Sequence, residues 1–236
     1  MRHVSEPEDR GLSHIIERQM RNWELARRQK VEALVPPEAG LKDFIAISRA
    51  VGLPGLRIAS RLGERLGWPV FVRQVLEAMA GDDEYLERIY AVMDERDVSW
   101  LENIAISMGL GKVGKEDYFH RLTRTVLSIA RTGNAVFLGH AADLVLPKNA
   151  GFRVALTASP EYCLLCYAEQ KHLPPAQAER QRTRIVKARA AFIRRHFRIR
   201  ADDPCRCDLV INMERFDENQ VVELILAGAR IRGVAG

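Results

Sequence analysis

Long hydrophobic runs are missing from this chain, and cysteine is scarce in it. No stretch of the 236 residues approaches the roughly 18 consecutive apolar residues that a membrane-spanning helix needs. The first ten residues, MRHVSEPEDR, lack the apolar core of a secretory signal. We therefore expect a cytoplasmic protein with no membrane partner, whose four cysteines stay reduced.

Positive charge is concentrated in one segment. Residues 180–206 hold ten Lys or Arg and two Asp, while the net charge of the whole chain is only +5, so the remainder is net negative. A nucleic-acid-binding domain would spread its positive charge more widely. The concentration indicates a local anionic ligand, such as a phosphorylated small molecule, and no nucleic-acid partner. A solvated basic helix without a ligand is the alternative.

Short apolar runs alternate with segments of helical periodicity along most of the chain. The runs predict five β-strands, at residues 44–48, 69–72, 135–139, 152–158 and 208–212. Basic helices are expected over 176–198, and residues 73–132 are expected to be mainly helical. Gly67 is expected to end the helix after the first strand, and Ser159 to cap the helix after the fourth. Asp217 is expected to cap the last helix, whose Val221, Leu224 and Ile225 would face inward. Strands that alternate with helices indicate an α/β fold with a parallel sheet.

The first 40 residues differ from the rest. Ile16, Met20 and Trp23 recur at helical spacing, and Val35-Pro36-Pro37 ends the helix. We expect residues 1–40 to form a helical arm and linker, and residues 41–236 to form the α/β domain. The arm would pack on the domain or on a second subunit, which would give a homodimer.

The turn after the first predicted strand carries a weak sequence signal for phosphate binding. Gly52 and Gly55 flank Leu53 and Pro54, and a helix follows, so backbone N–H groups at the helix start would point toward an anion. The pattern G-x-x-x-x-G-K-[ST] is absent, although Arg57 lies two residues beyond the second glycine. A tight strand-to-helix turn without a ligand explains the glycines equally well.

Two cysteine pairs raise the question of a metal site. Cys163-x-x-Cys166 follows the fourth predicted strand, whereas Cys205-x-Cys207 precedes the fifth. In a parallel sheet these positions lie at opposite edges, about 17 Å apart, so one shared zinc site is not expected. We predict no metal ligands, and interpret the cysteines as small core side chains.

Several blocks resemble the cytidylate kinase-like family. Ser48–Ala59 resembles the family's first strand and phosphate loop, S-R-E-[YF]-G-S-G-G-R-x-I-A, and Ala135–Ala142 resembles V-I-V-G-R-G-A. Leu156–Tyr162 matches the turn before the lid, Arg189–Arg195 resembles R-A-A-Y-Y-R-R, and Cys207–Asn212 resembles Y-D-L-V-I-N. The blocks occur in order and cover roughly residues 44 to 227.

The resemblance implies a three-layer α/β/α fold of the P-loop kinase type, with a lid at about 172–206. It implies transfer of the γ-phosphate of ATP, with Mg²⁺, to a small-molecule nucleotide such as CMP or dCMP. The donor phosphates would lie against Gly52, Leu53, Gly55, Leu56, Arg57 and Ile58. Positive charge at the transferred group would come from Arg57, Arg189, Arg194 and Arg195. The acceptor would be held by His140, Asp143, Arg184 and Lys187.

The chain departs from the family pattern at positions near phosphate. Leu53 and Pro54 replace Ser and Gly, and proline removes one N–H. Ala50 replaces an acidic residue, Leu56 replaces a basic one, and His140 replaces an arginine. These changes keep two other hypotheses open: an inactive relative that serves as a regulatory or interaction module, and a kinase for a different acceptor.

Overall fold

The computed structural model describes residues 40–72, 76, 118–139 and 141–235. The strands are β1 (Phe44–Arg49), β2 (Val70–Phe71), β3 (Ala135–Leu138), β4 (Phe152–Thr157) and β5 (Leu209–Asn212). The helices are α2 (Gly55–Leu66), α6 (Tyr118–Thr132), α7 (Ala142–Val145), α8 (Pro160–Lys171), α9 (Pro175–Phe197) and α10 (Glu218–Ile231), with a 3₁₀ turn at Pro204–Arg206. Apart from Gly40 and Leu76, the predicted arm and the helical prediction for 73–117 lie outside the described residues.

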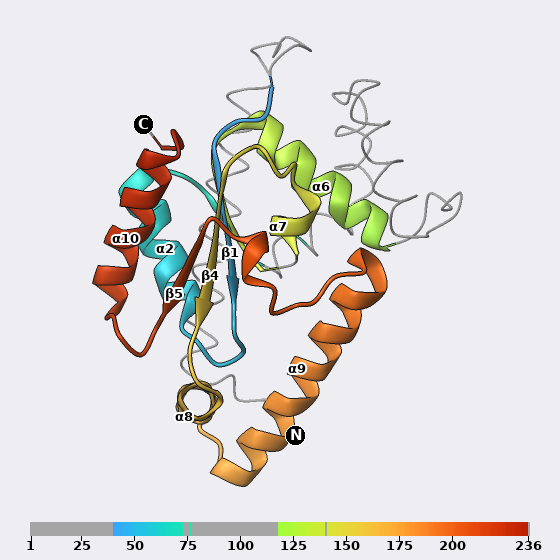
Figure 1. Ribbon diagram of the computed structural model, residues 1–236, viewed down its shortest axis with the longest axis vertical. Helices are drawn as coiled ribbons and strands as arrows, with labels where there is room; N and C mark the ends of the chain where they lie inside the picture. The colour runs from blue at the N-terminus through green and yellow to red at the C-terminus, as the bar shows by residue number, and fades with distance from the viewer. Residues whose placement is uncertain (1–39, 73–75, 77–117, 140, 236) are drawn as a thin grey trace, which may run out of the picture.

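The five strands form one sheet in the order β2-β3-β1-β4-β5, and every neighbouring pair is parallel. Helices α2 and α10 cover one face, and α6 and α7 lie on the other (Figure 1). The predicted three-layer α/β/α fold is therefore confirmed. All five predicted strands are present, each within two residues of its expected ends.

The centre of the sheet is buried on both faces, which explains why its strands are almost wholly apolar. Phe44, Ile45, Ala46 and Ile47 of β1 are at most 1% exposed. The Phe137 ring of β3 stacks on Phe71 with centroids 5.7 Å apart, and meets Phe44 edge-on at 6.3 Å. These contacts fix β1 and β3 side by side, so their carboxyl ends open onto the same edge.

Three predicted helix ends are confirmed in detail. The Ser159 hydroxyl accepts a hydrogen bond from the Tyr162 N–H at 3.2 Å. Asp217 and Gln220 form a capping box at the start of α10. Gly67 ends α2 in the left-handed conformation, with φ of 67°.

Two helix predictions need correction. Leu224 was expected to face the core from α10, but 37% of its surface is exposed. The buried face of α10 runs through Val221, Val222 and Ile225, and Leu224 falls beyond its edge. The basic segment expected as several helices is one continuous helix, α9, of 23 residues.

Helices α8 and α9 form a hairpin beyond the carboxyl ends of the strands (Figure 1). The hairpin has its own small apolar cluster, in which Val51 from the turn after β1 meets Tyr167 and Ala178. The Tyr167 hydroxyl donates to Gln181 Oε1 at 3.3 Å, which ties α8 to α9. The hairpin thus rests on the turn that follows β1. Within the described ranges, no helix has both the length and the apolar character needed to cross a membrane.

Candidate functional site

The turn between β1 and α2 requires glycine at one position. Gly52 has φ of 111°, a conformation that side chains rarely adopt. A Cβ atom there would lie 2.1 Å from the carbonyl oxygen of Cys163 in α8. The glycine therefore lets the turn approach the hairpin closely.

Few backbone N–H groups in this turn are directed outward. The Leu53 N–H donates to the Ala50 carbonyl at 3.3 Å, and the Gly55 N–H donates to the Leu53 carbonyl at 2.8 Å. Pro54, between them, has no N–H. The Leu53 side chain is 2% exposed and belongs to the core. The N–H groups of Leu56 and Arg57, in the first turn of α2, are those that helix geometry leaves for an anion.

Side chains of the α8–α9 hairpin donate hydrogen bonds to backbone carbonyl groups of the turn and of the end of β1. Gln170 of α8 donates to the Gly52 carbonyl at 2.8 Å. Arg182 of α9 donates to the Val51 carbonyl at 3.0 Å, and Arg189 donates to the Arg49 carbonyl at 3.5 Å. One face of α9 therefore points its basic side chains at the end of β1.

Arg49, the last residue of β1, lies within the matched motif Ser48–Ala59 but was not among the predicted site residues. A Cβ atom on Gly55 would lie 2.2 Å from Arg49 Cδ, and one on Gly139 would lie 3.7 Å from Arg49 Nη1. The side chain thus lies across the start of α2 and reaches the end of β3. Its position at the carboxyl end of the central strand, where open α/β sheets bind ligands, is the signal that could have identified it.

The Arg49 guanidinium is in an unfavourable electrostatic environment. Burial, and then the positive charge of Arg189, lower the pKa of Arg49 to about 10. Among the residues that the structure describes, no carboxylate pairs with it. Within the described residues, the positive charge of Arg49 is therefore left without a carboxylate partner.

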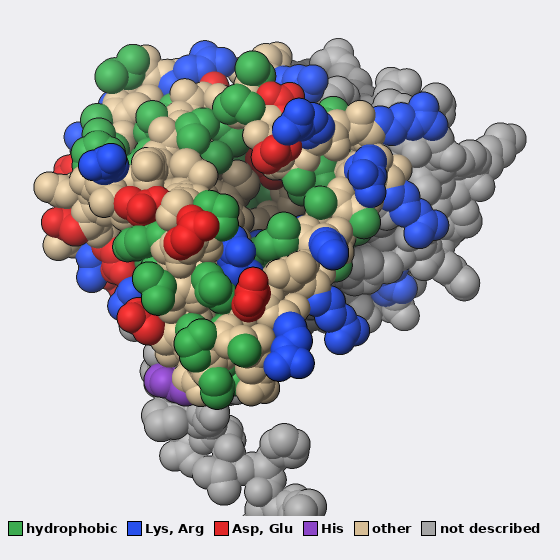
Figure 2. Space-filling view, turned by 60° about the horizontal axis from the view of Figure 1, so that its bottom comes forward, with side chains coloured by type: hydrophobic (Ala, Val, Ile, Leu, Met, Phe, Trp, Pro, Cys, Tyr) green, Lys and Arg blue, Asp and Glu red, His purple; other side chains and the backbone are tan. Residues whose placement is uncertain are grey.

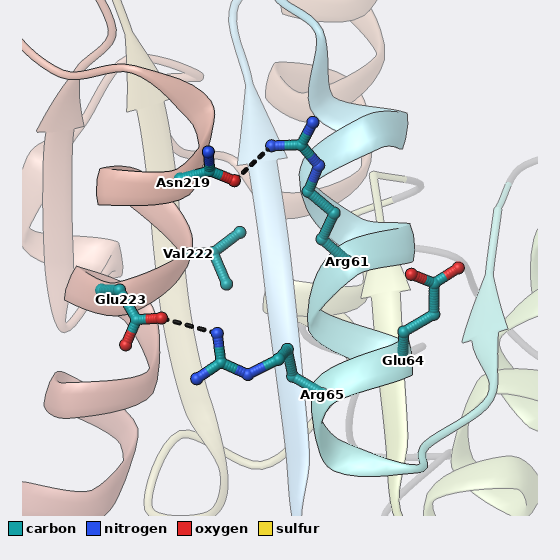
Figure 3. Close-up of a pocket in the computed structure, with 6 residues that line it drawn as sticks. All are labelled: Arg61, Glu64, Arg65, Asn219, Val222 and Glu223. Carbon is teal, nitrogen blue, oxygen red and sulfur yellow. Dashed lines mark hydrogen bonds and ion pairs between the residues drawn. The ribbon is translucent and has the colours of Figure 1, made fainter.

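Arg57 points to α10 in this structure. Its Nη2 atom lies 2.7 Å from Glu218 Oε1. Arg61 and Arg65, the next basic residues of α2, also contact α10 (Figure 3). Arg61 donates to Asn219 at 2.7 Å, and Arg65 donates to Glu223 at 2.6 Å. A shallow pocket between α2 and α10 is lined by these pairs together with Glu64 and Val222. Since its two arginines are already paired across the helices, we assign it no ligand.

Most of the predicted lid residues lie on another face of α9. Arg184, Lys187, Arg194 and Arg195 are exposed, whereas Arg182 and Arg189 contact the turn. Figure 2, which looks toward the carboxyl edge of the sheet, shows Lys and Arg side chains gathered on the side where α9 lies, beside a central hollow. Of the five predicted residues, the structure brings only Arg189 to the end of β1, where Arg182, which was not predicted, joins it.

In α7, which follows β3, the Asp143 carboxylate is held by a buried ion pair. Arg206 Nε donates to Asp143 Oδ2 at 3.0 Å, and Arg206 Nη2 makes a still closer contact with the same atom. The side chains of Asp143 and Arg206 are only 4% and 8% exposed. Asp143 therefore ties α7 to the segment after α9. His140, the other predicted acceptor residue, lies outside the described residues.

The four cysteines are free thiols, and the interpretation of them as core side chains holds only for Cys163, because Cys166 and Cys207 are half-buried and Cys205 is exposed. Cys163 is buried in α8, and burial raises the pKa of its thiol. Cys207 lies before β5, with its sulfur 3.9 Å from Ser48 Oγ. The described part of the chain holds no cluster of three or more metal-ligating side chains.

Comparison with known proteins gives a family and a fold. Residues 44–215 match the cytidylate kinase-like family, and no curated protein matches the chain. An uncharacterized protein from Eubacterium ventriosum has a similar structure, with a TM-score of 0.64 at 18% identity over 79% of this chain and 97% of its own. A gluconokinase from Sinorhizobium meliloti has a TM-score of 0.42 at 14% identity, over 82% of this chain and 95% of its own. A shikimate kinase from Bacteroides thetaiotaomicron has a TM-score of 0.42 at 12% identity, over 81% and 99%. The first likeness supports the fold, and the two weaker ones add no argument.

Proposed function

Since the chain belongs to the cytidylate kinase-like family, as its motifs indicated, we propose that it transfers the γ-phosphate of ATP to a nucleoside monophosphate such as CMP or dCMP. In this reaction a phosphate oxygen of the acceptor bonds to the γ-phosphorus. The bond from that phosphorus to the β,γ-bridging oxygen breaks, and ADP leaves with the electron pair. Such transfer depends on positioning and on neutralising negative charge more than on covalent catalysis.

The observation that carries the proposal is the approach of Arg189 to the end of β1. Arg189 donates to the Arg49 carbonyl at 3.5 Å, so the hairpin already holds a cation above the strand-turn-helix unit. A guanidinium suits this place, because its planar fork binds phosphate oxygens in pairs. The positive charge of Arg49, which has no carboxylate partner within the described residues, fits a polyanionic ligand at the same point.

The donor phosphates would lie at Gly52, Leu53 and Gly55 and at the helix start formed by Leu56, Arg57 and Ile58. Mg²⁺ would neutralise charge on the phosphates and would be held mainly by their oxygens, because Ala50 leaves the turn without an acidic side chain. Arg57 would take part only after leaving Glu218, which is 2.7 Å away in this structure.

The acceptor nucleotide would bind on the α7 side, near His140 and Asp143. Arg184, Lys187, Arg194 and Arg195 are exposed on α9 and would reach it only if the helix turned or moved toward the sheet. Lid closure of this kind excludes water from the transferring group.

A catalytically inactive relative that serves as a regulatory or interaction module is the second candidate. It is favoured by the hydrogen bonds within the turn: the N–H groups of Leu53 and Gly55 are used internally, and Gln170 and Arg182 hold two of the turn's carbonyls. A turn fixed in this way would not need a ligand to be stable.

Calorimetry and a turnover assay on one sample separate the two candidates. The purified chain is titrated with Mg-ATP and then with CMP, and ADP release is followed in a coupled assay with CMP, dCMP and other monophosphates. Binding of both ligands with acceptor-dependent ADP release supports the kinase. Absence of ATP binding at millimolar concentration would contradict it and favour the inactive module.

A further inference from the structure

Two consecutive backbone carbonyls in the turn after β1 point toward the α8–α9 hairpin. Arg182 of α9 donates to the Val51 carbonyl at 3.0 Å, and Gln170 of α8 donates to the Gly52 carbonyl at 2.8 Å. In a turn that binds an anion, consecutive N–H groups face the ligand instead. On the side that faces the hairpin, the turn thus presents acceptors where an anion would need donors.

The peptide group between Gly52 and Leu53 is held at both of its ends. Its carbonyl accepts from Gln170, and its N–H donates to the Ala50 carbonyl at 3.3 Å. Because a trans peptide group is planar, its C=O and N–H point in opposite directions and turn together. The Leu53 N–H can therefore reach an anion only if the whole peptide rotates, and that rotation takes the Gly52 carbonyl away from Gln170.

Gly52 makes such a rotation possible. Rotating the peptide changes mainly the ψ angle of Gly52 and the φ angle of Leu53, and glycine has access to more of φ/ψ space than any other residue. Of the two hydrogen bonds that oppose the rotation, the one from Leu53 is long at 3.3 Å, whereas the one from Gln170 has a near-ideal length of 2.8 Å. Gln170 therefore supplies most of the restraint.

The packing of α8 places Gln170 over the turn. Tyr167 of α8 packs against Val51, and Gln170 lies three residues further along the same face of the helix. A Cβ atom on Gly52 would lie 2.1 Å from the Cys163 carbonyl oxygen, so the turn and α8 are in close contact there. Docking of the hairpin and the hydrogen bond from Gln170 are therefore one event.

We propose that Gln170 is an autoinhibitory latch, which holds the Gly52–Leu53 peptide with its carbonyl toward α8 and so keeps phosphate out of the turn. The inference rests on the proposed function and names the regulation of its donor site. Phosphate binds once the peptide has rotated, so that the Leu53 N–H joins those of Leu56 and Arg57 at the start of α2. Donor binding then loosens α8 from the turn, and by linkage any contact that presses α8 onto the turn weakens donor binding.

The latch predicts an effect of opposite sign to that of a ligand-binding residue. A hydrogen bond that exists only in the phosphate-free form must be broken on binding, so its removal raises the affinity for the donor. The net contribution of one such bond corresponds to a change of about 2- to 10-fold in the dissociation constant.

The test is isothermal titration of the full chain and three variants with Mg-ATP and with tripolyphosphate. Gln170→Met keeps the length of the side chain without an N–H donor, and Gln170→Asn keeps the amide on a shorter side chain that does not reach the carbonyl. Gln177→Met is the matched control, because Gln177 is exposed at the start of α9 and, among the described residues, its side chain makes no hydrogen bond to the turn. We expect both Gln170 variants to bind about 2- to 10-fold more tightly than the unchanged chain, and Gln177→Met to bind equally.

Thermal midpoints of the same proteins distinguish a latch from a purely structural contact. Without ligand, Gln170→Met should unfold at a lower temperature than the unchanged chain, because it has lost a hydrogen bond. With saturating Mg-ATP the difference should disappear, because the bond is already broken in the bound form. A difference of the same size in both conditions would overturn the latch.

The outcomes separate this inference from the proposed function. Equal or weaker donor affinity in Gln170→Met would overturn the latch, and acceptor-dependent ADP release by the same protein would leave the kinase proposal standing. Tighter donor binding without ADP release for any monophosphate would support the latch and contradict the proposed transfer. Absence of donor binding in every protein would contradict both. If Gln170→Met fails to fold, as judged by circular dichroism, Gln170→Asn decides by the same criteria.

Discussion

Asp143 and Arg206 form an ion pair that is almost completely buried, with side chains only 4% and 8% exposed. The pair joins α7 to the segment that leads from α9 back to β5. Arg206 also donates to the Ala201 carbonyl at 2.8 Å, so its guanidinium organises that segment as well. The base of the hairpin and the short helix α7 are therefore coupled through one arginine.

Removing Arg206 should be strongly destabilising. Arg206→Ala would leave the Asp143 carboxylate buried without its cation, and breaking a buried pair in this way costs about 3–5 kcal/mol. Urea denaturation measures the free energy of unfolding. The matched control is Arg200→Ala, because Arg200 pairs with Asp202 in full solvent and its loss should leave the unfolding midpoint unchanged. Equal midpoints for both variants would contradict the buried pair.

Removing Arg49 should have the opposite effect on the ligand-free protein. Burial lowers the pKa of Arg49 from its ordinary value to about 10 in the folded state, so below pH 10 the folded state holds a charge that burial disfavours. Arg49→Gln should therefore raise the free energy of unfolding at pH 7 by about 1–3 kcal/mol. An arginine with a purely structural role would give a loss instead.

The difference in unfolding free energy between Arg49→Gln and the unchanged chain should depend on pH. Between about pH 10 and 12.5 the unfolded chain keeps the Arg49 proton while the folded chain has released it. Stability rises with pH wherever the unfolded state binds more protons. The advantage of Arg49→Gln over the unchanged chain should hence be largest below pH 10 and shrink above it. Parallel urea titrations of both proteins at pH 7 and just above pH 10 measure this, and a constant difference would contradict the lowered pKa.

Arg189→Ala should abolish phosphoryl transfer without unfolding the chain. Arg189 is exposed on α9, and its contact with the Arg49 carbonyl is long at 3.5 Å. The coupled ADP-release assay measures the activity, and the thermal midpoint checks the fold. Normal turnover in Arg189→Ala would contradict a role for Arg189 and the hairpin in phosphoryl transfer.

Gly52→Ala should destabilise the turn after β1. The new Cβ would lie 2.1 Å from the Cys163 carbonyl oxygen, and alanine disfavours φ of 111°. We expect a loss of about 2–4 kcal/mol in the free energy of unfolding, from strain and from displacement of α8. Gly40→Ala is the control, because a Cβ at Gly40 meets nothing within 4 Å. A loss no larger than that of the control would show that the hairpin moves away from the turn at little cost.

The sheet could be predicted from the sequence because buried parallel strands appear there as short continuous runs of apolar residues. Phe44, Ile45 and Ile47 form a continuous apolar run, and the caps at Ser159 and Asp217 are defined by residues within three positions of each other. Leu224 was misassigned because it lies just beyond the edge of the buried face of α10, a boundary set by contacts with other elements.

The candidate site could be predicted only in part. The turn from Gly52 to Gly55 was found from its glycines, but the internal use of its N–H groups depends on the backbone path between them. Arg49 matches the arginine of the S-R-E motif but was assigned no role, because its burial and its lack of an acidic partner among the described residues are visible only in the structure. Arg184, Lys187, Arg194 and Arg195 were grouped with Arg189 by sequence, yet helical geometry puts them on another face of α9.

The measurement that tests the central claim most directly is CMP-dependent release of ADP from Mg-ATP by the unchanged chain, Arg49→Gln and Arg61→Gln. We predict release by the unchanged chain and by Arg61→Gln at equal rates, and a rate at least about tenfold lower for Arg49→Gln. Equal release by all three proteins, or no release by any of them with CMP or another monophosphate, would contradict a phosphotransfer site built on Arg49.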